Sequence, residues 1–143
     1  IRFIENPSEA VQLAAIKRDS ASIQFIKKPT EKVQLAAVND NGYWIRFIKN
    51  PSEKIQLLAV KAVPLAIKYI KNPSEELQLM AVEKDPVAIN SIENPSEKVQ
   101  LAAVKKMIEK KDFAWWIKDH ILPEENKHLS PKMKDILRKA YGL

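Results

Sequence analysis

Apolar residues recur along the chain every 22 positions, which indicates an internal repeat. Isoleucine occupies positions 1, 23, 45, 67 and 89 and also 4, 26, 48, 70 and 92, and leucine occupies 13, 35, 57, 79 and 101. Polar positions keep the same spacing, with proline at 7, 29, 51, 73 and 95 and glutamate at 9, 31, 53, 75 and 97. A fixed period of this length is typical of arrays in which each unit packs on its neighbours.

Each repeat predicts an α-helix that begins at an Asn-Pro-Ser-Glu motif. In Asn6-Pro7-Ser8-Glu9, asparagine is the expected N-cap, proline the first helical residue and glutamate the third. The glutamate complements the positive end of the helix and can accept a hydrogen bond from the cap amide. The helix is expected to continue to about Lys17. The motif recurs at Asn50, Asn72 and Asn94, whereas Lys28 replaces asparagine in the second repeat.

A shorter helical element, either α or 3-10, is expected between each α-helix and the next proline. Its start signals are Asp19-Ser20, Asn41-Gly42, Val63-Pro64 and Asp85-Pro86. Neither element is long enough to be stable alone, so the core must be shared between stacked units. The predicted fold class is therefore all-α, an α-solenoid of five 22-residue units.

The period breaks after Val104, and this break sets the expected organisation of the chain. Residues 1–104 are predicted to form the repeat array and residues 105–143 a C-terminal helical cap in the same domain. Lys105–Lys111 should extend the fifth α-helix, and Ser130-Pro131 should start a last helix that Gly142 ends. The aromatic cluster of Phe113, Trp115 and Trp116 is expected to seal the last unit, with a partner-binding hot spot at Trp115 and Trp116 as the alternative.

The opposite end begins at Ile1, inside a short element. An uncapped end of a solenoid exposes apolar surface, so end-to-end self-association is a further expectation, with a longer parent chain as the alternative.

Two columns of the repeat are candidates for either packing or binding. The aromatic column consists of Phe3, Phe25, Phe47 and Tyr69; it lies in the apolar arc of the short element, so we predict core packing, with a ligand-binding stripe as the alternative. The glutamine column consists of Gln12, Gln34, Gln56, Gln78 and Gln100. Because buried amides need partners, we predict a structural ladder that bonds each glutamine to the next unit. The alternative is a row of amides that grips an extended peptide or a nucleic-acid strand.

The motifs resemble two groups of repeat proteins. Asn-Pro-Ser-Glu leading into a leucine-containing helix is similar to leucine-rich variant repeats, a resemblance that implies alternating α- and 3-10 helices in a right-handed superhelix. The segment from Ala37 to Ile45 resembles the short helical repeats of uncharacterised bacterial and viral proteins. The resemblance covers about residues 1–104. It implies no catalytic residue.

Composition argues against most kinds of catalytic chemistry. The chain has no cysteine and only two glycines, so it lacks a thiolate nucleophile, a disulfide framework and a glycine-rich phosphate loop. His120 and His128 with Glu124 have metal-like spacing, but Pro123 interrupts that segment and no further strong ligand is evident. We expect no enzyme activity, no cofactor and no metal. Without an apolar run long enough for a membrane span, the protein is expected to be soluble and cytoplasmic.

Charge suggests where a partner binds. The 143-residue chain has 24 basic and 18 acidic side chains and a net charge of +6. One basic strip is expected on the middle units, at Arg46, Lys49, Lys68 and Lys71, and a second on the last helix, at Lys132, Lys134, Arg138 and Lys139. The leading hypothesis is a non-enzymatic scaffold that binds another macromolecule, a protein in the first place. The alternatives are nucleic-acid binding through the two strips and a structural spacer that associates through its ends.

Overall fold

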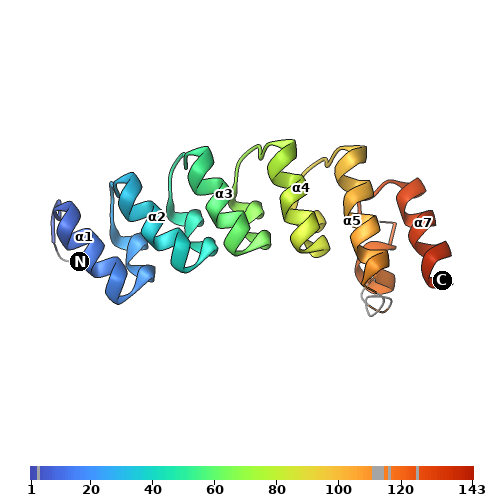
Figure 1. The fold of residues 1–143 in the computed structure, drawn as a ribbon, viewed down its shortest axis with the longest axis horizontal. Helices are drawn as coiled ribbons and strands as arrows, with labels where there is room; N and C mark the ends of the chain where they lie inside the picture. Colours follow the sequence, from blue (N-terminus) through green and yellow to red (C-terminus); the bar gives the residue numbers. More distant parts are fainter. Residues whose placement is uncertain (3, 111–114, 116, 125) are drawn as a thin grey trace. The chain divides into compact units, whose positions relative to one another are not determined.

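The computed structural model describes residues 1–2, 4–110, 115, 117–124 and 126–143. Among the described residues the regular elements are all helices, with no β-strand, and α-helices alternate with 3-10 helices in sequentially packed units (Figure 1). The predicted fold class is thereby confirmed. The alternation is the one that the resemblance to leucine-rich variant repeats implies. No helix among the described residues combines the length and the apolar character needed to span a membrane.

The first four repeats have helices of constant length: a ten-residue α-helix followed by a six-residue 3-10 helix. These elements are α1 (Glu9–Arg18), η1 (Ser20–Phe25), α2 (Glu31–Asp40), η2 (Gly42–Phe47), α3 (Glu53–Ala62), η3 (Pro64–Tyr69), α4 (Glu75–Lys84) and η4 (Pro86–Ser91). They are followed by α5 (Glu97–Glu109), a π-helical turn η6 (Ile117–Ile121) and α7 (Pro131–Tyr141).

The α-helices begin two residues later than the sequence motif predicts. The N-cap is serine or threonine, not asparagine; Ser8 is extended and its side chain accepts a hydrogen bond from the Val11 amide. Glutamate is therefore the first helical residue. Its carboxylate links successive repeats instead of closing a capping box: Ser52 Oγ donates to Glu31 at 3.1 Å, and Ser96 Oγ donates to Glu75 at 2.6 Å.

The asparagine before each proline has a different role from the one expected. Asn6, Asn50, Asn72 and Asn94 adopt positive φ angles of 49° to 53°. Asparagine tolerates this left-handed conformation better than most residues, while the following proline disfavours the right-handed helical region at its predecessor. Lys28, at the same position of the second repeat, is not among the residues with positive φ. The Asn-Pro pair thus reverses the chain direction before the serine caps the helix.

Polar caps start most of the 3-10 helices at the predicted sites. The side chains of Asp19, Asn41 and Asp85 each accept a hydrogen bond at 3.0 Å from the amide two residues on. At η3 the start is instead Val63 followed by Pro64, which needs no amide partner. Each of these 3-10 helices has an isoleucine as its C-cap. The amide of that isoleucine donates to the carbonyl of the isoleucine three residues before, as Ile26 does to Ile23.

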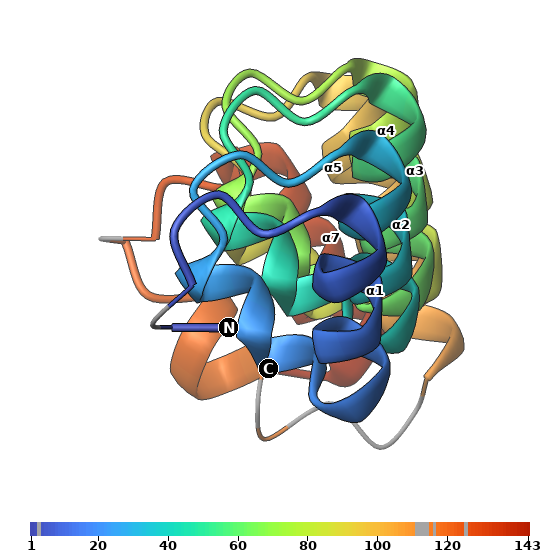
Figure 2. The same cartoon turned by 90° about the vertical axis from the view of Figure 1, so that its left-hand side faces the viewer.

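The chain divides into two compact units, Ile1–Asn72 and Pro73–Leu143. In the first unit, α1, α2 and α3 pack in sequence and so do η1, η2 and η3, so the unit has one α layer and one 3-10 layer (Figure 2). Its core is formed by isoleucine, valine and alanine columns, among them Ile23, Ile45, Val33 and Ala37. The segment 105–143, expected to cap the array, belongs to the second unit together with α4 and η4.

In the second unit, α5 packs against α4 on one side and against α7 on the other. The apolar surface of the last repeat is covered by α7 and by the segment before it. Four side chains of that segment are buried: Ile117, Ile121, Leu122 and Leu129. Ser130 and Gly142 bound α7 as predicted, with Gly142 at a φ of 66°. Trp115 is 67% exposed and does not seal the core, while Phe113 and Trp116 lie outside the described residues.

The glutamine side chains bond within their own repeats, not to the next unit as the predicted ladder required. Each amide nitrogen donates at 2.8–2.9 Å to the carbonyl of the proline five residues earlier, in its own unit. The bond ties the α-helix to the turn that precedes it. Gln100 makes a further contact, because its Oε1 accepts the Ser130 amide at 2.8 Å. The equivalent oxygen of Gln12 is buried and has no hydrogen-bond partner.

The first repeat exposes residues that later repeats bury. Ile4 is 51% exposed and Val11 is 40% exposed. Their counterparts in the second repeat, Ile26 and Val33, are buried. Equivalent positions of the first and second repeats therefore differ in exposure in the structure.

This contrast predicts unequal costs for the same substitution at equivalent positions. Val33→Ala should lower the free energy of unfolding by about 2 kcal/mol, because it removes fully buried methyl groups and leaves a cavity. Val11→Ala should change it by less than about 0.5 kcal/mol, because the side chain is already in contact with solvent. Urea unfolding of both variants measures the difference, and equal losses would contradict the packing described here.

A second prediction concerns the glutamine column. Gln56→Leu should cost about 1–2 kcal/mol, because the Pro51 carbonyl loses its amide donor. Gln24→Leu is the matched control: Gln24 is exposed and donates to the Ala21 carbonyl in its own 3-10 helix, so the change should stay within about 0.5 kcal/mol. Thermal unfolding of both variants gives the comparison. If Gln56→Leu were as stable as the parent, the glutamines would not be structural.

Candidate binding surface on the 3-10 helices

The aromatic column lies at the surface of the first unit, so the prediction that it packs in the core is wrong. Phe25, Phe47 and Tyr69 are each 37–38% exposed, and Phe3 lies outside the described residues. A 3-10 helix has three residues per turn, so Ile23 and Ile26 eclipse each other on the buried face. Phe25 then projects about one third of a turn away from them. An α-helical wheel also separates it from the isoleucines, by about 100° from Ile26 and about 160° from Ile23, so its placement inside the apolar arc was wrong for either helix type.

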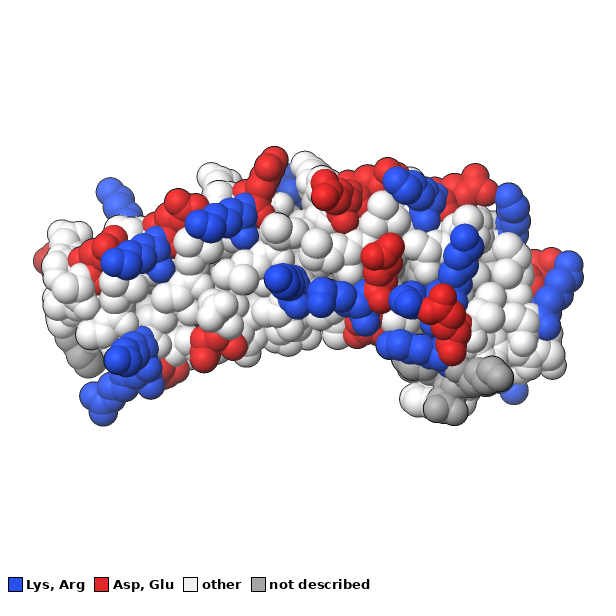
Figure 3. Space-filling view, viewed as in Figure 1, with Lys and Arg blue, Asp and Glu red and all other residues white. Residues whose placement is uncertain are grey.

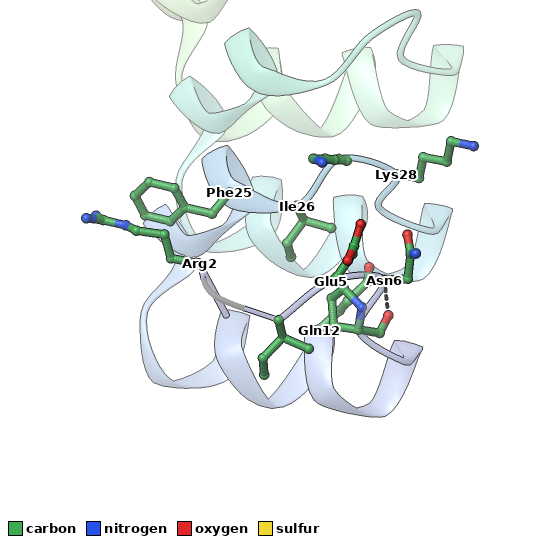
Figure 4. A pocket seen from close by; sticks show the side chains of 10 residues that line it. Arg2, Glu5, Asn6, Gln12, Phe25, Ile26 and Lys28 are labelled. Carbon is green, nitrogen blue, oxygen red and sulfur yellow. Dashed lines mark hydrogen bonds between the residues drawn. The ribbon is translucent and has the colours of Figure 1, made fainter.

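Basic side chains lie directly over these rings. The guanidinium carbon of Arg2 is 4.2 Å from the centroid of Phe25, and Figure 4 shows the two side chains extending next to each other. The guanidinium carbon of Arg46 is 4.7 Å from the centroid of Phe47. The amino group of Lys68 is 4.9 Å from the centroid of Tyr69. Contacts of this kind hold a cation in place while leaving its charge available to a ligand.

Tyr43 and Trp44 join the pairs into a continuous surface. Arg46 also lies 5.2 Å from the Trp44 ring, and Lys68 lies 5.8 Å from the Tyr43 ring. Tyr43 packs edge to face on Tyr69 in the next repeat, with ring centroids 6.2 Å apart. We call the set the cation–aromatic surface; it consists of Arg2, Phe25, Tyr43, Trp44, Arg46, Phe47, Lys68 and Tyr69.

A polar chain fixes the orientation of Trp44. The indole N–H donates to Ser20 Oγ at 2.8 Å, and that hydroxyl donates to Asp40 Oδ2 at 2.5 Å. The three residues come from η2, η1 and the end of α2, so they connect two repeats. Trp44 is also stacked on Phe47, with an interplanar angle of 28°. The surface is therefore ordered before any partner binds.

The net charge of the protein resides in the first unit. Residues 1–72 have 12 basic and 6 acidic side chains, a net charge of +6, whereas residues 73–143 have 12 of each. The exposed lysines Lys27, Lys49 and Lys71 follow the three rings by two positions each and add to the charge of the 3-10 layer. On the face formed by the α-helices, basic and acidic side chains are interspersed (Figure 3). A positive, aromatic surface is thus specific to the 3-10 helices of this unit.

The electrostatic effect is visible at Tyr69. Hydrogen bonding with the Lys68 and Arg46 side chains, together with their charges, lowers the pKa of the Tyr69 hydroxyl below its ordinary value, against a weaker effect of burial. The fourth repeat lacks the aromatic ring, the basic residue before it and the lysine two positions after it. Asn90, Ser91 and Glu93 occupy the positions that Lys68, Tyr69 and Lys71 occupy in the third.

The second predicted basic strip, on the last helix, is largely engaged within the protein. Lys134 is buried and donates to the Pro123 carbonyl at 2.6 Å. Lys132 and Lys139 form ion pairs with Glu97 at 2.8 Å and Asp135 at 2.9 Å, and hydrogen bonding to these carboxylates raises the pKa of both lysines. Arg138, the remaining member, is half-buried. The structure therefore does not bring these four residues together as an open basic surface.

Two cavities accompany the repeats. One, of about 490 Å³, lies between the N-terminal segment and the turn after η1; it is lined by Arg2, Ile4, Glu5, Gln12, Phe25 and Lys28 among others (Figure 4). It adjoins the first ring of the cation–aromatic surface. The other, of about 680 Å³, lies between α4 and α5, where Lys106 is paired with Glu109 at 2.7 Å. That pair raises the pKa of Lys106 and leaves this cavity with charges of both signs.

The two histidines belong to the second unit. His128 Nδ1 is 2.9 Å from the Ile92 carbonyl oxygen, and the His120 ring contacts Trp115 edge to face. Within the described part of the chain, no three His, Cys, Asp or Glu side chains are placed to hold a metal ion.

Sequence reasoning found part of this site. It named Arg46, Lys49, Lys68 and Lys71, and the structure places Arg46 and Lys68 on adjoining rings with Lys49 and Lys71 exposed beyond them. It missed Tyr43 and Trp44, which have no counterparts in the other repeats. A helical wheel of either period separates the aromatic column from the buried isoleucines, so its place outside the core could have been predicted. In comparisons with known proteins, no family model, no curated protein and no solved structure matches the chain.

The positive potential at Tyr69 can be measured directly. The chain has three tyrosines, so replacing Tyr43 and Tyr141 by phenylalanine leaves Tyr69 as the sole reporter of tyrosinate absorbance. In this background Lys68→Met should raise the pKa of Tyr69, because it removes the largest cause of the lowering. Lys54→Met, on the α-helical side, is the control and should leave the titration unchanged.

The sign of the stability effect follows from the same shift. A phenol whose pKa is lower in the folded state stabilises that state when ionised, at alkaline pH above its unfolded-state pKa. This contribution is lost as the pH falls through the folded-state pKa, so none of it is present at neutral pH. An identical Tyr69 titration with and without Lys68 would contradict the contact.

Proposed function

We propose that the chain is a non-enzymatic helical-repeat scaffold that binds another protein through the cation–aromatic surface of its first unit. The observation that carries the proposal is the row of exposed aromatic rings with basic side chains held over them. Repeat proteins bind through extended surfaces of this kind, with the repeats acting as rigid supports. The proposed partner presents acidic groups to a surface on a unit of net charge +6.

The residue types on this surface favour a protein partner. Tryptophan, tyrosine and arginine are the residues most enriched at binding hot spots, and Trp44, Tyr43 and Arg46 lie together here. Their side chains are already fixed by contacts with one another, so little conformational entropy is lost on binding. Lysine alone would make a surface of similar charge with no such anchors.

Nucleic acid is the second candidate, and the combination of rings and cations is what favours it. Single-stranded nucleic acids bind to positive grooves in which aromatic side chains stack on the bases. Against this, a long polyanion would be favoured by positive charge that continues along the repeats, and the fourth repeat has Asn90, Ser91 and Glu93 at the positions of Lys68, Tyr69 and Lys71.

A role as a self-associating spacer rests on a different part of the molecule, the apolar face at Ile4 and Val11. Sedimentation equilibrium distinguishes it, because association through that face would make the mass depend on concentration. Ile4→Glu would then restore the monomer, whereas substitutions on the cation–aromatic surface would have no effect.

Selection from a random peptide library tests the proposed function, because a random library assumes no particular partner. Peptides are selected on the parent protein and then measured on the double variant Arg46→Glu, Lys68→Glu. We expect enrichment of acidic and apolar residues and a loss of affinity of at least about tenfold in the variant, because two positioned cations become repulsive. The matched control is Lys54→Glu, Lys61→Glu, which reverses two exposed charges on α3 and should bind normally.

Peptides that bind the Arg46→Glu, Lys68→Glu variant as well as the parent would place the interface elsewhere. A titration with labelled single-stranded and duplex nucleic acid is run beside the selection. If these bind tightly with a steep salt dependence while no peptide is selected, the nucleic-acid candidate replaces the protein candidate.

A further inference from the structure

The rings of the cation–aromatic surface recur once per repeat. Phe25, Phe47 and Tyr69 lie at the ends of η1, η2 and η3, and these helices pack against one another in order. Packed helices are typically about 8–10 Å apart, so successive rings are expected at about this interval. A ligand that lies along the row and contacts every ring must therefore repeat itself over the same distance.

Among regular peptide conformations, polyproline II has this period. It has three residues per turn and rises about 3.1 Å per residue, so one turn advances about 9 Å and every third side chain points the same way. An α-helix fits less closely, because one turn advances about 5.4 Å and two turns about 10.8 Å. In a β-strand, residues three apart point to opposite sides. Aromatic surfaces are also the ones that bind proline-rich segments in this conformation.

The charges around the rings specify the rest of the ligand. A basic residue lies directly over each ring: Arg2, Arg46 and Lys68. A second series of exposed cations, Lys27, Lys49 and Lys71, follows the rings with the same 22-residue period. Both series stop at the fourth repeat. The ligand should therefore have acidic residues between the positions that contact the rings, over a length of about nine residues.

Building on the proposed function, we propose that the cation–aromatic surface binds a proline-rich acidic segment in the polyproline II conformation. A proline of every third position packs on Phe25, Phe47 and Tyr69 in turn, and the acidic side chains between them pair with the stacked and the flanking cations. Because the segment is extended before it binds, it loses little entropy on binding, and this suits a surface that is likewise already ordered.

The test is a fluorescence anisotropy titration with a labelled peptide of four Pro-Pro-Glu triplets. Two control peptides test separately whether the spacing of the prolines and the polyproline II conformation are needed for binding. One has the same composition as four prolines, four glutamates and four prolines, an order in which no register places prolines at three successive turns, and the other has glycine in place of every proline. The triplet peptide should bind at least about tenfold more tightly than either control, and the interaction should weaken as salt is added.

Variants of the protein locate the site. Phe47→Ala should raise the Kd for the triplet peptide about tenfold, as expected for an aromatic anchor, while Leu57→Ala, an exposed apolar residue on α3, should not change it. Should Phe47→Ala fold poorly, Lys49→Glu with Lys71→Glu serves instead, because both lysines are exposed. This second variant should weaken binding and reduce its salt dependence.

Each contrary result has a distinct meaning. If the glycine peptide or the reordered peptide binds as tightly as the triplet peptide, conformation or period is not recognised and the inference is wrong. If no triplet peptide binds, but library-selected peptides bind in a manner that depends on Arg46 and Lys68, this inference fails and the proposed function stands. If a single-stranded oligonucleotide of about 12 nucleotides binds in place of any peptide, both are wrong.

Discussion

The structure depends on a pair of isoleucines three residues apart in each 3-10 helix. With three residues per turn, Ile23 and Ile26 point in the same direction and both are buried, as are their counterparts Ile45 and Ile48. This one geometric fact decides which side chains the layer presents to solvent. It places the aromatic column outside the core, where a basic side chain lies over each ring. The three-residue period of the 3-10 helix therefore determines both which isoleucines pack in the core and which rings form the surface proposed to bind a partner.

Most of the fold could be predicted from the sequence because the same helix-starting and helix-ending residues recur in successive repeats. The alternation of helices, the caps at Asp19 and Asn41 and the final helix from Ser130 to Gly142 follow from local signals alone. What could not be predicted was which residue caps each helix and which group accepts each hydrogen bond. Asn6 and Ser8 can both cap a helix, and only the backbone shows that asparagine turns the chain while serine caps it. Likewise, Gln56 needed a carbonyl, and its nearest one, at Pro51, belongs to its own repeat.

The candidate site was harder to predict for a different reason: its distinctive residues are exceptions to the repeat. Trp44 and Tyr43 have alanine, leucine or valine at the equivalent positions of the next two repeats, so a column-by-column comparison gives them no special weight. The uneven distribution of net charge was also not evident from the sequence. Divided at residue 104, the two parts of the chain have net charges of +2 and +4, whereas the division into compact units gives +6 and zero. Ion pairs such as Lys132 with Glu97 then account for much of the basic residue content of the second unit.

The asparagine in the turn before each proline has a consequence for the chemical lifetime of the protein. Exposed asparagines in turns commonly deamidate, because the backbone nitrogen of the following residue attacks the side-chain amide to form a cyclic imide. Proline carries no hydrogen on that nitrogen, so the route is blocked at Asn6, Asn50, Asn72 and Asn94. Asn41 precedes Gly42 and has no such protection. Opening of the imide gives aspartate or isoaspartate. The aspartate would still provide a cap of the kind that Asp19 and Asp85 provide, whereas the isoaspartate would lengthen the backbone at the start of η2.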